Sequence, residues 1–83
     1  MQMQQIFQTF DVYTAAAITV ILRIEPTYKV ENGRTIFLFP RSESIHQALN
    51  DFNAGIELNS YEYAQTIKRL RAEMLSRRNG GSR

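Results

Sequence analysis

Residues 28–39 read Tyr28-Lys29-Val30-Glu31-Asn32-Gly33-Arg34-Thr35-Ile36-Phe37-Leu38-Phe39, two strand-like runs joined by Asn-Gly. Both central residues of a two-residue type I′ turn need positive φ, which Asn tolerates and Gly adopts freely. The sequence therefore predicts a β-hairpin in which Glu31 faces Arg34, Val30 faces Thr35 and Tyr28 faces Phe37. One face of this hairpin is the predicted core face, and it carries Tyr28, Val30, Phe37 and Phe39. Ile36 and Leu38 point to the opposite face, which is also partly apolar.

Upstream of the hairpin, Gln4 to Phe10 alternates weakly between apolar and polar residues, which favours a short N-terminal edge strand. Asp11 is a good helix cap, and the alanine-rich run after it predicts a helix over Asp11–Ile21. This helix has almost no polar face, because only Thr14 and Thr19 interrupt the apolar residues. It must therefore be covered on all sides, either by the C-terminal helix or by a second subunit.

Downstream of the hairpin, Pro40 ends the strand and either Ser42 or Ser44 caps an amphipathic helix that Gly55 terminates. Asn59 and Glu62 are spaced as a second cap. The last helix reaches about Arg78 and is predicted to bury Tyr63, Ala64, Ile67, Leu70 and Met74. The order predicts an α+β fold of helix, hairpin and two further helices, with a domain over 1–78 and a flexible tail over 79–83.

The whole of Phe7–Met74 resembles a small family of domains of unknown function from bacterial, phage and other mobile-element genomes. The resemblance is carried by Thr9-Phe10-Asp11, Tyr13-Thr14-Ala15-Ala16, Ile36-Phe37-Leu38-Phe39, Phe52-Asn53-Ala54-Gly55, Tyr61, Lys68 and Leu70. These residues are mostly caps, turns and core aromatics, so the resemblance implies a shared fold and assigns no chemistry. Similar chains tend to have glycine after the first helix, where this chain has Leu22-Arg23-Ile24, and acidic residues where it has Pro40-Arg41.

Composition argues against most catalytic and metal chemistry. The 83 residues include one histidine and no cysteine, so no disulfide framework or zinc-thiolate site is available. His46 lies off the apolar stripe of its helix and is expected to face solvent, and no serine has an evident base and acid beside it. The glycines form no phosphate-binding loop. We therefore expect a cytoplasmic protein that is not an enzyme, with no cofactor, no metal and no membrane span.

The basic residues are concentrated at the end of the chain. Residues 61–83 carry six of the ten Lys and Arg residues but only two of the eight acidic residues. Arg69, Glu73 and Arg77 are spaced four apart and are expected to neutralise one another. The remaining cations of the helix have no acid four residues away and are the candidate nucleic-acid-binding residues: Lys68, Arg71 and Arg78.

Two functions remain open at this stage. The first is a small accessory protein that binds nucleic acid through these three cations, with Phe37 and Phe39 as less favoured candidates for base stacking. The second is a homo-oligomeric protein that binds a protein target as an inhibitor or sequestering factor through apolar contacts. In this second case the basic residues are an ordinary solvated helix end, where cations favour the helix dipole.

Overall fold

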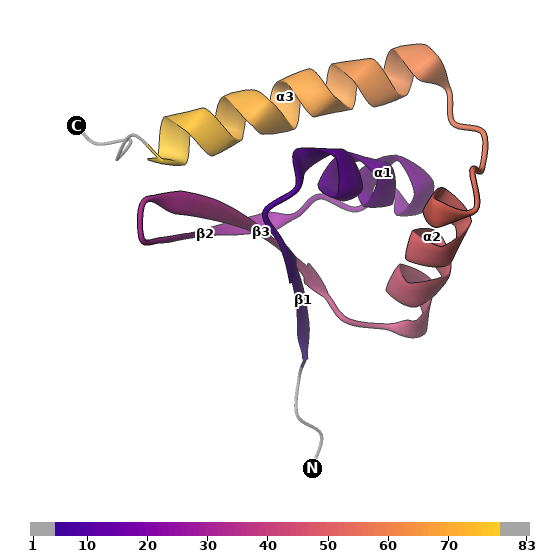
Figure 1. The fold of residues 1–83 in the computed structure, drawn as a ribbon, viewed down its shortest axis with the longest axis horizontal. Coiled ribbons are helices and arrows are strands. Elements are labelled where there is room, and N and C mark those ends of the chain that lie inside the picture. The colour runs from indigo at the N-terminus through magenta and orange to yellow at the C-terminus, as the bar shows by residue number, and fades with distance from the viewer. Residues whose placement is uncertain (1–4, 79–83) are drawn as a thin grey trace.

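The computed structural model describes residues 5–78, which form a three-stranded antiparallel sheet and three helices (Figure 1). The elements in chain order are β1 (Ile6–Thr9), α1 (Val12–Leu22), β2 (Thr27–Glu31), β3 (Arg34–Pro40), α2 (Glu43–Asn53) and α3 (Ser60–Arg78). The sheet order is β1-β3-β2, so β3 is central. The predicted α+β fold is confirmed, including the N-terminal edge strand. The predicted tail, residues 79–83, lies outside the described residues.

The hairpin has the predicted turn and register. Asn32 and Gly33 have φ values of 51° and 75°, as a type I′ turn requires. Glu31 pairs with Arg34 and Tyr28 with Phe37, and the rings of this second pair lie 5.6 Å apart between centroids. A local two-residue signal is therefore sufficient to align the two strands.

The two faces of the sheet are buried to different extents. Phe37 and Phe39 are fully buried in the main core, as predicted for that face. Val30 shares this face but is 45% exposed, so its predicted place in the core is wrong. It lies near the hairpin tip on the outer strand of the sheet, away from the core cluster. On the opposite face Ile36 is buried and Leu38 is half-buried, and neither belongs to the main core cluster.

The apolar helix α1 is covered within the chain. Asp11 caps it, accepting hydrogen bonds from the Tyr13 amide at 3.2 Å and the Thr14 hydroxyl at 2.7 Å. Helices α2 and α3 and the sheet pack around it, and its buried residues are Val12, Ala15, Ala16, Ala17, Ile18, Thr19 and Val20. The C-terminal helix therefore provides the cover that the sequence demands, and α1 needs no second subunit.

The exit from α1 uses a left-handed residue that is not glycine. Arg23 has φ 61° and ψ 37°, and its amide donates to the Thr19 carbonyl at 2.8 Å. Glycine adopts this conformation without steric cost, which accounts for the glycine expected here from the family resemblance. The chain accepts an arginine at this place, and that side chain contacts α3.

The last two helices begin at polar caps. The Ser42 hydroxyl accepts from the Ile45 amide at 3.3 Å, so Ser42 and not Ser44 is the cap of α2. Asn59 caps α3 by accepting from the Glu62 amide at 2.8 Å. The buried side of α3 centres on Leu70, which is fully buried, whereas Ala64 is exposed and its predicted burial is wrong. Ala64 lies on the side of the helix that α1 and the sheet do not cover.

A hydrogen bond links β3 to the long helix α3. The buried Thr35 hydroxyl donates to the Met74 carbonyl at 2.9 Å. Replacing Thr35 by valine conserves the shape of the side chain and removes the donor, so we expect Thr35→Val to lower the free energy of unfolding by about 1 kcal/mol. Chemical denaturation measures this change. Thr27→Val, at an exposed position of β2, is the control and should change stability by less than about 0.5 kcal/mol.

Candidate nucleic-acid interface

Helix α3 carries its charges on two separate flanks. Its core-facing side contains Leu70 and the half-buried Tyr63 and Met74. On one side of this stripe lies the neutralised flank, defined as Glu62, Arg69, Glu73 and Arg77. On the other side lies the open flank, defined as Lys68, Arg71 and Arg78. At 3.6 residues per turn the open flank covers an arc of about 80 degrees.

Both arginines of the neutralised flank form ion pairs. The Arg77 Nε lies 2.7 Å from the Glu73 carboxylate, as the spacing predicts. Arg69 was expected to share Glu73, but it instead makes a bidentate contact with Glu25 at 2.8 and 3.1 Å. Glu25 precedes β2 and is brought to α3 only by the fold, so the prediction for Arg69 is corrected. Arg23 forms a further ion pair with Glu62.

These contacts shift the affinity of the paired groups for protons. The hydrogen bond from Arg23 lowers the pKa of the Glu62 carboxyl, and the same bond raises the pKa of the Arg23 guanidinium. The hydrogen bond to Glu25 likewise raises the pKa of Arg69. Arg23, Glu25 and Arg69 are largely exposed and the Glu62 side chain is 35% exposed, so the pairs balance charge more than they stabilise the fold. Their electrostatic effect is to remove net positive charge from this flank.

The open flank keeps its positive charge. Lys68, Arg71 and Arg78 are exposed, and within residues 5–78 none of them forms an ion pair with a carboxylate. The structure therefore places the three predicted residues on one side of one helix. Lys68 and Arg71 are neighbours one turn apart, and Arg78 lies about 15 Å from Lys68 along the axis at 1.5 Å per residue.

Arg71 has an aromatic neighbour on α1. Its Nη2 donates to the Tyr13 hydroxyl at 3.0 Å, and its Cζ lies 5.5 Å from the centroid of that ring. Tyr13 is in turn tied to α3, because the Tyr63 hydroxyl donates to the Tyr13 carbonyl at 3.1 Å. The guanidinium is thus positioned by a neutral partner, which restricts its motion without cancelling its charge.

The aromatic residues suited to base stacking are not the ones predicted. Phe37 and Phe39 are 0% and 1% exposed, so no base has access to them and their candidacy is excluded. The structure instead exposes Phe10 and Tyr13, at 48% and 49%, on either side of the α1 cap. The Arg34 guanidinium lies over the Phe10 ring, 4.0 Å from its centroid. Sequence pattern gave no direct signal for these rings, because their exposure depends on how elements distant in the chain pack.

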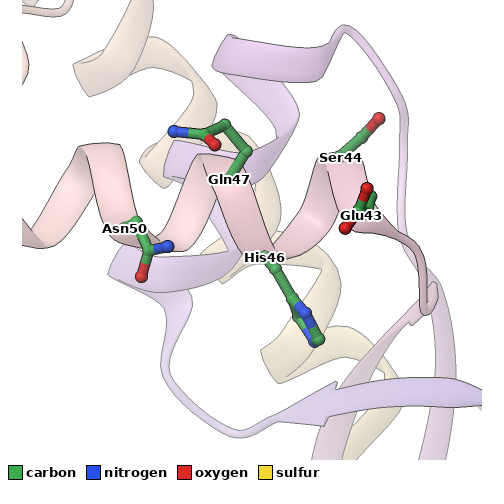
Figure 2. A pocket seen from close by; sticks show the side chains of 5 residues that line it. All are labelled: Glu43, Ser44, His46, Gln47 and Asn50. Atoms are coloured by element: carbon green, nitrogen blue, oxygen red, sulfur yellow. The ribbon is translucent and has the colours of Figure 1, made fainter.

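His46 lies where the sequence predicts, on the exposed side of α2. A shallow depression there is lined by Glu43, Ser44, His46, Gln47 and Asn50, and Figure 2 shows that all five side chains come from this one helix. Arg41 Nη1 is 3.2 Å from His46 Nε2, and because arginine has no acceptor the histidine nitrogen accepts this bond. All five lining residues belong to α2, so no second element lines this depression.

Two kinds of feature are absent from the described residues. Between residues 5 and 78, no three His, Asp or Glu side chains gather closely enough to hold a metal ion. Over the same residues, none of the helices combines the length and apolar character needed to cross a bilayer.

The chain is thus a small α+β domain in which a charged helix lies across an apolar helix and a three-stranded sheet. It belongs to the family described as Domain of unknown function (DUF5659), whose model matches residues 4–76. The match includes the whole of Phe7–Met74, so the resemblance to a domain of unknown function is confirmed. Comparison with curated proteins and with solved structures gives no match.

The Arg23–Glu62 pair predicts a pH effect. Because the folded state lowers the pKa of Glu62 below its ordinary 4.5, the pair stabilises the fold above that pH. This contribution is lost as the pH falls through the lower pKa of the folded protein. We expect Glu62→Gln to flatten the decline of unfolding free energy in this acid range, as measured by urea denaturation at several pH values. Glu57→Gln, at an exposed residue with no ion pair in the described chain, should keep the native decline.

Proposed function

We propose that this protein is a small non-catalytic accessory protein that binds nucleic acid through the open flank of α3, mainly by contacting phosphates. One observation carries the proposal: Lys68, Arg71 and Arg78 lie on the same exposed flank with no carboxylate partner in the described chain, beside a flank whose arginines are paired. Clustered cations without local counter-charges attract polyanions and release their condensed counterions.

The rigidity of α3 supports this function. Leu70 and Met74 pack into the core and Thr35 bonds the helix backbone, so the backbone that carries the three cations is held in place before any ligand arrives. A preformed helix loses less backbone freedom on binding than a flexible basic tail. Arg71 uses one of its N–H groups on Tyr13 and retains others for a phosphate, which guanidinium groups bind in a bidentate manner.

The exposed rings extend the proposed contact. Tyr13 lies beside Arg71, and Phe10 lies beneath Arg34, so each ring already has a cation against it. Bases of a single strand stack on exposed aromatic rings, and arginine adds to this contact. We assign Tyr13 a secondary role, as a stacking surface next to the phosphate-binding cations.

The expected setting fits an accessory role. The resemblance noted from the sequence implies chains from bacterial, phage and mobile-element genomes, and a small cytoplasmic binding protein is consistent with such a source. The proposal involves no cofactor, no metal and no catalysis.

A second candidate function is protein binding through the face of the sheet opposite the core. Ile6 is 44% exposed and Phe10 is 48% exposed on this face, with the half-buried Leu38 between them in the sheet. These apolar side chains favour the interaction protein, an inhibitor or sequestering factor, that the composition leaves open. The covered α1 no longer supports this reading, so it rests on the sheet face alone.

Salt dependence tests the nucleic-acid proposal. If the open flank neutralises three phosphates, log affinity should fall with log salt at a slope of about −2.7 on duplex DNA, which weakens binding about forty-fold between 50 and 200 mM salt. Fluorescence anisotropy with duplex and single-stranded oligonucleotides measures this slope. Replacing Lys68, Arg71 and Arg78 together by glutamine should remove most of it and weaken binding to all sequences about equally.

A variant of equal charge provides the control. Replacing Arg23, Arg69 and Arg77 by glutamine removes the same formal charge, but from residues that already have carboxylate partners. This variant should retain most of the native affinity and slope. Equal weakening by both triple variants would contradict a localised interface, and a native protein that does not bind either oligonucleotide at low salt would exclude the function.

A further inference from the structure

Strand β2 is an outer strand of the sheet, and within residues 5–78 no strand pairs with its outer edge. The two-residue turn closes on the pair Glu31–Arg34, whose main-chain groups bond to each other. By alternation Lys29 also bonds to β3, whereas the N–H and C=O groups of Tyr28 and Val30 point outward. A second contact confirms this alternation, because the Arg41 amide donates to Gln5 at 2.9 Å and places the odd-numbered residues of β3 toward β1.

Two side chains of opposite charge flank a valine along this edge. Lys29 and Glu31 point to the same face of the sheet, with the Lys29 Nζ 3.4 Å from the Glu31 carboxylate. Val30 lies between them on the other face and is 45% exposed. Such an edge, with a cation and an anion on either side of an exposed valine, is complementary to its own copy when the copy runs in the opposite direction.

We propose that β2 pairs with β2 of a second copy of this chain, antiparallel and with the two-fold axis at Val30. In this register each Lys29 faces the partner's Glu31, and the two residues form a non-hydrogen-bonded pair, in which side chains approach most closely. The outward main-chain groups of Val30 bond to those of the partner's Val30. The result is a continuous six-stranded sheet with two salt bridges at the junction.

Charge selects this register over its neighbours. An axis at Lys29 would place Lys29 directly against the same residue of the partner, which is destabilising. An axis at Tyr28 would leave Lys29 opposite threonine, with no charge pair. Lysine on an edge strand normally discourages pairing. Here Lys29 favours one register over the next, because an axis at Val30 places it opposite the partner's Glu31 and an axis at Lys29 places it opposite another lysine.

Strand β2 is held in place by a contact that leaves its outer edge accessible. The Arg77 guanidinium lies over the Tyr28 ring, 4.4 Å from its centroid, so α3 holds β2 from the core face of the sheet. The main-chain groups on the outer edge lie in the plane of the sheet and point away from this contact. The pairing therefore needs no rearrangement of the hairpin, and its entropic cost is correspondingly small.

Charge reversal tests the proposal without any nucleic acid. Sedimentation velocity and native mass spectrometry over micromolar to near-millimolar concentrations should show a dimer of the native chain. Lys29→Glu and Glu31→Lys each replace two attractive pairs by two repulsive ones, so each should raise the dimer dissociation constant by about tenfold or more. An equimolar mixture of the two variants should form a heterodimer, and the double variant with both changes should recover the native dimer.

A proline pair separates loss of pairing from loss of fold. Proline lacks the N–H group, so Val30→Pro removes only an outward donor, whereas Lys29→Pro removes a donor that bonds to β3. We expect Val30→Pro to keep the native circular dichroism spectrum and to be monomeric, and Lys29→Pro to disrupt the hairpin. A native chain that stays monomeric overturns the proposal. So does a dimer that survives in Lys29→Glu, Glu31→Lys and Val30→Pro alike, because it must use another surface.

Discussion

The burial of Leu70, Ile18, Phe37 and Phe39 in one cluster joins α3, α1 and β3. Helix α1 is apolar on nearly every side, so it forms a stable helix only where other elements surround it. Helix α3 supplies one side of that cover, and the sheet and α2 supply the rest. The orientation of α3, and hence of every charge on it, follows from the need to shield α1 from water.

That packing divides the charges of the molecule. With Leu70 and Met74 facing the core, Glu62 and Arg69 lie beside the end of α1 and the start of β2, where Arg23 and Glu25 meet them. Arg71 on the other side meets a tyrosine and, among residues 5–78, no carboxylate. The same constraint that buries the apolar helix therefore leaves one flank neutral and the other positive. It also places α3 over the core face of β2, so the outer edge of that strand remains available.

Local patterns predicted the fold well and exposure less well. The Asn-Gly turn, the Asp11 and Asn59 caps and the register of the hairpin all depend on neighbouring residues, and all are confirmed. The wrong predictions concern burial, because a periodic pattern of apolar residues can continue past the part of an element that is buried. Val30 continues the correct face of its strand but lies near the hairpin tip on the outer strand, away from the core cluster, and Ala64 adjoins the apolar stripe but faces solvent.

In the candidate site too, local pattern predicted some features and tertiary packing decided the others. Residue type and helical spacing suffice to group Lys68, Arg71 and Arg78 on one arc, because these residues share a single helix and its period is constant. Whether a given arginine keeps its charge unbalanced depends on partners far away in the chain, and Glu25 is 44 residues from Arg69. The accessibility of Phe10 and Tyr13, in contrast to the burial of Phe37 and Phe39, likewise follows from how the layers stack. Short-range chemistry therefore accounts for the elements and their order, and only long-range packing establishes which charges and rings the surface presents.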